Sequence, residues 1–129
     1  MITEDYCSFE VAKLLKEKGF EDECFGTYSV GDHELSVSSE CPYENDPNDD
    51  ILVAAPTHQM AIKWLREVRN IEINVSMSAL NSDNSREYMF NIFFTNERYL
   101  EPSKTKTGFK CYEEAAEAAI KYCLTNLIK

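Results

Sequence analysis

The sequence Ala54-Ala-Pro-Thr-His-Gln-Met-Ala-Ile-Lys-Trp-Leu-Arg-Glu-Val-Arg-Asn-Ile-Glu-Ile-Asn-Val75 joins a predicted helix directly to a predicted strand, and it contains the only tryptophan of the chain. Thr57 is a suitable N-cap, because its hydroxyl can accept a hydrogen bond from a free backbone N–H of the first helical turn. Apolar residues at helical spacing predict an inner face made of Met60, Ala61, Trp64, Leu65 and Val68. Ile62 and Arg66 are expected on the outer face, and Trp64 is expected in the core.

The spacing of apolar residues changes to two after Asn70, which suits the left-handed conformation that ends many helices. Apolar side chains at 71, 73, 75, 77 and 79 alternate with polar ones, which predicts a strand that is covered on one face.

The other elements are expected around this helix and strand. A first helix begins after Ser8 and ends at Gly19 and Phe20 with a Schellman-type stop. The remaining predictions are a hairpin of 24–30 and 34–38 around Gly31-Asp32, an edge strand or lead-in at 51–54, strands at 87–96 and 107–110, a polar loop at 97–107, and a helix from Cys111. Together they predict a single α+β domain over 1–129, with two layers and an antiparallel sheet of four or five strands on which the helices pack.

Residues 40–50 contain Pro42, Pro47 and the run Asn45-Asp-Pro-Asn-Asp-Asp50. This composition is typical of turns and buries little apolar surface, so we expect a mobile, acidic loop.

Two stretches resemble a known family. Residues 55–71, with Trp64-Leu-Arg-Glu67 at the centre, and residues 108–120, with Tyr112-Glu-Glu-Ala115, are similar to a family of small proteins of gut Bacteroidetes and of their prophages and mobile elements. Arg69 stands where many members have histidine, and Cys111 where they have serine. The family has no established activity, so the resemblance implies a bacterial cytoplasmic setting and little about chemistry.

The composition favours a cytoplasmic protein. No apolar run is long enough to span a bilayer, and the first five residues are acidic, whereas a secretory signal begins with basic residues. Five cysteines are an odd number and include no Cys-x-x-Cys pair, which indicates reduced thiols.

The net charge of −10 is confined to one segment. No lysine or arginine lies between Lys18 and Lys63, and this interval contains ten acidic residues, whereas the rest of the chain has 13 basic and 13 acidic residues. Such a field repels the phosphates of DNA and RNA, so direct binding of nucleic acid is not expected.

No constellation of residues predicts a catalytic, cofactor or metal site. Asp46, Asn48 and Asp50 have the first spacings of a calcium loop, but Ile51 replaces its glycine and Thr57 its glutamate. With only His33 and His58, a zinc site would need ligands brought together from distant segments. The aromatic residues of 88–94 are interpreted as core rather than as a base-stacking platform.

The sequence leaves two functions open. The first is a non-enzymatic accessory module of phage or mobile-element type that binds a basic host or phage protein; a homodimer and no membrane contact fit the same interpretation. The alternative is a small enzyme whose site is assembled from distant residues. The predicted interaction surface combines acids of the loop with residues on the outer face of the central helix. It consists of Glu44, Asp46, Asp49, Asp50, Ile62 and Arg66.

Overall fold

The computed structural model describes residues 2–97 and 101–128 and confirms the α+β class. Its elements, in chain order, are α1 (Phe9–Glu17), β1 (Gly26–Ser29), β2 (Leu35–Val37), β3 (Leu52–Ala55), α2 (His58–Arg69), β4 (Ile71–Leu80), β5 (Arg86–Phe94), β6 (Lys104–Phe109), α3 (Tyr112–Tyr122) and a π-helical turn η1 (Cys123–Leu127).

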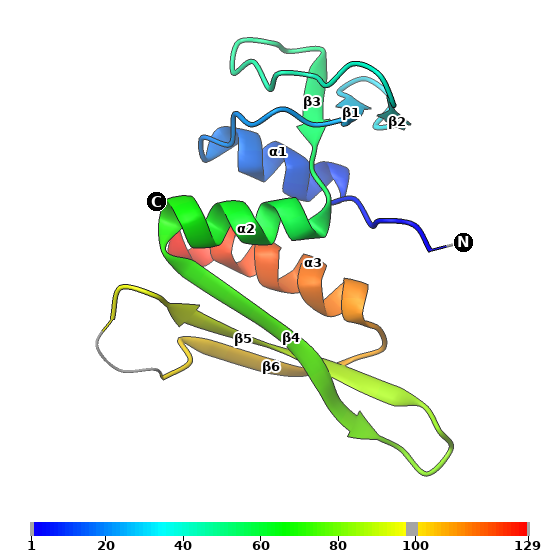
Figure 1. The fold of residues 1–129 in the computed structure, drawn as a ribbon, viewed down its shortest axis with the longest axis vertical. Coiled ribbons are helices and arrows are strands. Elements are labelled where there is room, and N and C mark those ends of the chain that lie inside the picture. The colour runs from blue at the N-terminus through cyan, green and yellow to red at the C-terminus, as the bar shows by residue number, and fades with distance from the viewer. Residues whose placement is uncertain (1, 98–100, 129) are drawn as a thin grey trace.

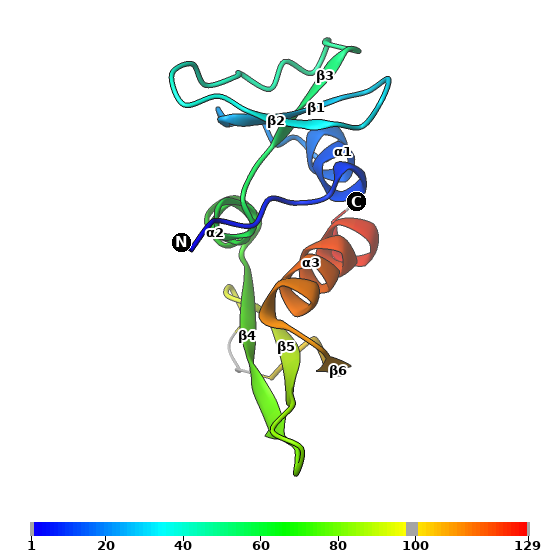
Figure 2. The same ribbon diagram turned by 90° about the vertical axis from the view of Figure 1, so that its right-hand side faces the viewer.

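The six strands form two separate antiparallel sheets of three strands each, with the orders β2-β1-β3 and β4-β5-β6. The sheets lie at opposite ends of the molecule, and the three helices lie between them (Figure 1, Figure 2). The expected two-layer domain with one sheet of four or five strands is therefore not confirmed.

The physical reason for two sheets lies in α1, which has apolar side chains on two sides. Val11 and Leu15 belong to the main core with α2 and α3, whereas Ala12 packs with Tyr28 and Val53 of the smaller sheet. Because α1 is covered by the first sheet on one side and by the main core on the other, it lies between the two sheets and keeps their strands apart. The predicted ends of α1 are confirmed, because Ser8 Oγ accepts a hydrogen bond from Val11 N and Gly19 has a φ of 98°.

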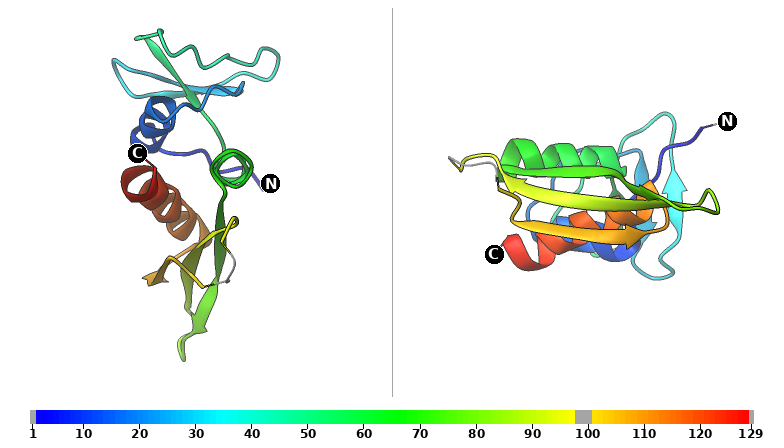
Figure 3. Two further views of the ribbon diagram at one scale, coloured as in Figure 1. Left: turned by 90° about the vertical axis from the view of Figure 1, so that its left-hand side faces the viewer. Right: turned by 90° about the horizontal axis from the view of Figure 1, so that it is seen from below.

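The corner between α2 and β4 has the predicted ends. Thr57 Oγ1 accepts a hydrogen bond of 3.2 Å from Met60 N, and Asn70 has left-handed backbone angles of 58° and 35°. β4 then pairs with β5, and the sheet lies across α2 and α3 (Figure 3, right).

The buried face of α2 differs from the predicted one. Ile62 is only 6% exposed, whereas Val68 is 56% exposed and Met60 lies at the surface. The face is rotated toward Ile62 because α2 contacts α3 as well as β4. The prediction that Ile62 lies on the outer face is wrong, so Ile62 is not available to an interaction surface.

Trp64 is buried in the main core, as predicted. Its ring meets Phe20 edge to face, with centroids 5.6 Å apart, and the Arg69 guanidinium lies 5.4 Å from its centroid. The tryptophan therefore packs against the turn that follows α1 as well as within the helix–sheet contact.

The second sheet has the predicted inward side chains, since Phe90 and Ile92 of β5 are fully buried. β6 begins at Lys104 rather than at 107. Its start is determined by backbone pairing with β5, which its mostly polar side chains do not reveal in the sequence. Residues 98–100 of the predicted loop lie outside the described residues.

The turn of the first hairpin also differs from the prediction. The positive φ is that of His33, at 59°, and not that of Gly31. The His33 ring stacks on Phe9 with centroids 3.7 Å apart, a contact that holds the turn against α1.

The acidic segment is attached to the body at several points. Tyr43 and Cys24 exchange both backbone hydrogen bonds, at 2.8 and 3.0 Å. The buried Asn45 side chain donates to Phe20 O at 2.7 Å and accepts from Ala54 N at 3.2 Å. These contacts attach the segment to the turn that follows α1 and to β3, and a mobile loop at 40–50 stays a prediction.

Replacing Trp64 by Ala should lower the free energy of unfolding by about 3–5 kcal/mol, because it removes a buried aromatic side chain from a packed core. A urea titration measures the change. Val68→Ala on the exposed side of the same helix is the control and should change stability by less than about 0.5 kcal/mol. If Trp64→Ala lowers the free energy of unfolding by less than about 1 kcal/mol, the Trp64 ring does not pack in the main core.

Candidate functional site

The N-terminal segment lies beside the start of α2 and brings two reactive side chains together. Cys7 N donates to Pro56 O and His58 N donates to Asp5 O, both at 2.9 Å, so Tyr6 and Thr57 form an antiparallel bridge. Cys7 directly precedes the N-cap of α1 and His58 is the first residue of α2. The two helices therefore begin next to each other.

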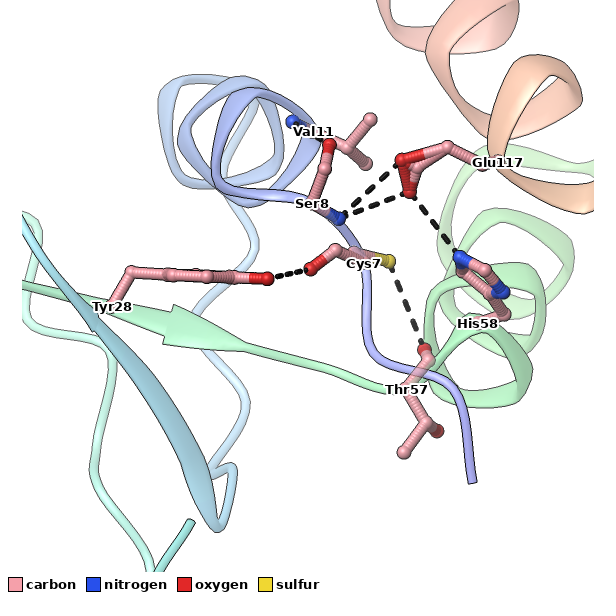
Figure 4. Close-up of polar contacts among 7 residues, drawn as sticks. All are labelled: Cys7, Ser8, Val11, Tyr28, Thr57, His58 and Glu117. Atoms are coloured by element: carbon pink, nitrogen blue, oxygen red, sulfur yellow. Dashed lines mark hydrogen bonds and ion pairs between the residues drawn. The ribbon is translucent and has the colours of Figure 1, made fainter. Parts of the chain in front are cut away.

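Glu117 of α3 points into the space between these two helix starts (Figure 4). Its Oε1 atom accepts hydrogen bonds from Ser8 N at 3.0 Å and from His58 Nε2 at 3.2 Å. Helix N-termini carry partial positive charge, so both helices favour a carboxylate here. Burial alone would raise the pKa of Glu117, but the hydrogen bonds from His58 and Ser8 outweigh it and hold the pKa below its ordinary value.

Cys7 lies at the centre of this junction, and none of its surface is exposed. Its carbonyl accepts a hydrogen bond of 2.6 Å from Tyr28 Oη, which connects β1 to the junction, and its Sγ lies 4.0 Å from Thr57 O. Burial raises the pKa of the Cys7 thiol, and the negative charge of Glu117 raises it further. A neutral, covered thiol is unsuited to nucleophilic attack on a substrate.

Cys7, His58 and Glu117 form one cluster of metal-ligand atoms. A ligand atom from each of the three residues lies within 4.8 Å of the other two. The second ring nitrogen of His58, Nδ1, is buried and has no hydrogen-bond partner among the described residues. We name this cluster the Cys7–His58–Glu117 junction. It brings sulfur, nitrogen and oxygen donors together from three distant segments, an arrangement that sequence reasoning did not identify.

The sequence contains a signal for this junction. Cys7 and His58 each stand next to an N-cap, and Glu117 is the single charged residue within Ala115-Ala-Glu-Ala-Ala119, a stretch otherwise suited to burial. A lone acid inside an apolar helical face predicts a buried carboxylate that needs hydrogen-bond donors.

Two hollows flank the junction. One, of about 200 Å³, is lined by residues 3–5, 57–59, Tyr112 and Glu113. The other, of about 470 Å³, is shallower and is lined mainly by Tyr6, His58, Phe109 and Glu117. Both contain His58, so the junction is reached from the surface through its imidazole side.

A second candidate site lies in the acidic segment. Residues 21–23 and 44–47 line a hollow of about 470 Å³, and five of them are acidic, namely Glu21, Asp22, Glu23, Glu44 and Asp46. The pairing of Cys24 with Tyr43 and the two hydrogen bonds of Asn45 hold the two stretches side by side. We name this feature the acidic hollow.

The predicted surface residues are not brought together as one patch. Glu44 and Asp46 line the acidic hollow, and Asp50 is exposed outside it. The Asp49 carboxylate instead accepts hydrogen bonds from Ile51 N and Tyr43 Oη, both at 2.8 Å, which lower its pKa. Asp49 therefore shapes the loop. Arg66 forms an exposed ion pair of 3.4 Å with Glu72 of β4.

No family model, curated protein or solved structure matches the chain. The resemblance to proteins of gut Bacteroidetes therefore stays a prediction. Over the described residues, every helix is too short or too polar to cross a membrane.

Replacing Glu117 by Gln should lower the free energy of unfolding by about 1.5–3 kcal/mol at neutral pH, because hydrogen bonds to a charged group are weakened. A carboxyl whose pKa is lowered by folding stabilises the fold above its ordinary pKa of about 4.5, and this contribution disappears as the pH falls through the lower pKa of the folded state. The difference between the two proteins should therefore shrink at about pH 3.5. Urea titrations at both pH values measure it.

Glu113→Gln is the matched control, because Glu113 lies one turn earlier on α3 and takes no part in the junction. It should change stability by less than about 0.5 kcal/mol at either pH. An equal loss for Glu117→Gln at both pH values would contradict a contribution from the ionised carboxylate.

Proposed function

We propose that the protein is a non-enzymatic binding module that recognises a basic protein through the acidic hollow. The observation that carries this proposal is the convergence of five carboxylates from two segments around one hollow of about 470 Å³. Lysine and arginine side chains are the groups that such a hollow favours.

The charge distribution supports the same function. No lysine or arginine occurs from residue 19 to residue 62, so no basic group from this part of the sequence neutralises the hollow. The field of the segment would raise the rate at which a basic partner is captured, especially at low ionic strength.

The hydrogen bonds that hold the two stretches of the acidic hollow together also support a role in binding a partner. Asn45 is almost fully buried and both ends of its amide are hydrogen-bonded, so the 44–47 stretch has a fixed position opposite 21–23. A binding surface that is already ordered loses less conformational entropy on association.

The alternative function, a small enzyme with a site assembled from distant residues, is favoured by one observation, which is the Cys7–His58–Glu117 junction. The thiol there is covered and neutral, and the hollow beside it is shallow. These properties favour binding over catalysis. The resemblance noted above supports a cytoplasmic setting in which the partner is a host or phage protein.

The test neutralises the hollow and measures binding. Immobilised wild-type protein is expected to retain a basic protein from a lysate of the source organism at low ionic strength and to lose it as salt is added. The hollow variant should associate with that protein at least about tenfold more slowly. It carries Glu21→Gln, Asp22→Asn, Glu23→Gln and Glu44→Gln, and it keeps Asp49 because Asp49 holds the loop.

A control variant with the same change of net charge separates the hollow from general electrostatics. It carries Glu4→Gln, Glu67→Gln, Glu97→Gln and Glu101→Gln, all at exposed positions outside the acidic segment. This variant should bind almost as well as the wild type. If the two variants bind equally, the hollow is not the interface, and its acids serve solubility.

A further inference from the structure

The Cys7–His58–Glu117 junction has a chemistry that goes beyond the proposed function. We propose that Cys7 Sγ, a ring nitrogen of His58 and the Glu117 carboxylate form a binding site for one Zn²⁺ ion. The three residues come from the N-terminal segment, α2 and α3, so the ion would connect the parts of the molecule that meet at this point (Figure 4).

The spacing of the donor atoms fits a shared metal. Zn²⁺ binds imidazole nitrogen and carboxylate oxygen at about 2.0–2.2 Å with tetrahedral geometry, so two such ligands lie roughly 3.3 Å apart. His58 Nε2 and Glu117 Oε1 are 3.2 Å apart. The sulfur lies within 4.8 Å of its two partners. A sulfur and an oxygen or nitrogen ligand of tetrahedral Zn²⁺ lie roughly 3.6 Å apart, so binding would draw the three side chains closer together.

The donor set indicates which metal is preferred. Ca²⁺ and Mg²⁺ are bound by oxygen ligands, whereas thiolate, imidazole and carboxylate are the three protein ligands of Zn²⁺. Binding displaces the thiol proton to solvent. The thiolate and the carboxylate then carry two negative charges, which balance the two positive charges of the ion, so no net charge is buried.

The other buried cysteines lack this setting. Burial raises the pKa of Cys24 and of Cys123 to about 12, as it raises that of Cys7. Among the described residues, however, the Cys7 cluster is the one group of three that combines its thiol with a histidine and a carboxylate at these distances. The shallow hollow beside His58 and Glu117 gives an ion a path to the junction and leaves room for water as a fourth ligand.

The direct test uses Co²⁺ as a spectroscopic probe on the wild-type protein after treatment with a chelator. One equivalent should bind, with a thiolate-to-cobalt charge-transfer band and the d–d bands of a tetrahedral site, and Zn²⁺ should displace it. Folded wild-type protein that shows no thiolate band, or that binds no Co²⁺, would overturn the proposal. This measurement needs no variant, so it decides the question even where variants fold poorly.

Variants then identify the ligands. Cys7→Ala and Glu117→Gln should each weaken Zn²⁺ binding at least about 100-fold, which exceeds the usual effect of a residue outside the ligand set. Cys41→Ser, at an exposed cysteine, and the hollow variant should bind Zn²⁺ as the wild type does. Circular dichroism checks that each protein is folded.

Two outcomes of the variant series would contradict the site. Unchanged binding in Cys7→Ala would show that another thiol or a carboxylate cluster holds the ion. Loss of binding in the hollow variant, with Cys7→Ala unaffected, would place an adventitious cation in the acidic hollow instead.

Discussion

The carboxylate of Glu117 is the group on which the arrangement of the helices depends. It lies where α1 and α2 both begin, and it accepts hydrogen bonds from the backbone of one and from the first side chain of the other. Since Glu117 belongs to α3, one side chain connects all three helices. Tyr28 extends the same junction to β1 through the carbonyl of Cys7. Segments from both halves of the sequence are therefore held at one point.

The two sheets follow from this arrangement. Once α1 begins beside α2 and α3, one side of it is committed to the main core through Val11 and Leu15. Its opposite side still carries Ala12 and Phe9, and these are covered by Tyr28 and Val53 of the first sheet. The strands before α2 thus have their own helix face to cover, and they do not join the strands that follow it.

The sequence predicted the ends of individual helices correctly, but it did not predict which helices and strands pack together. Caps at Ser8 and Thr57 and the left-handed Asn70 depend on neighbouring residues alone, so the ends of α1 and α2 could be predicted. Ile62 could not be placed, because its burial depends on α3, which lies fifty residues further along the chain. The junction was missed for the same reason, since the local signals at its three residues do not show that folding brings them together. The acidic character of 21–50 was evident from composition, but the hollow depends on the pairing of Cys24 with Tyr43.

Acids from outside α1 lie at its two ends, and the two ends give them different surroundings. Glu117 lies at the start of the helix, where the partial positive charge of its N–H groups favours a carboxylate. Glu21, Asp22 and Glu23 lie just beyond its other end, where helix carbonyls carry partial negative charge and disfavour carboxylates. Most of those carbonyls are already hydrogen-bonded, since the backbone N–H groups of 18–20 and the Arg69 guanidinium donate to them. Lys16 Nζ donates to the carbonyls of Asp49 and Leu52, and among the described residues it forms no ion pair with the acids of the hollow. Acids near the negative end of a helix dipole and near one another are disfavoured for folding, and sites where a local rule of stability is broken are where function is expected. This contrast between the two ends of α1 is why the acidic hollow, rather than the buried junction, is assigned the recognition of a partner.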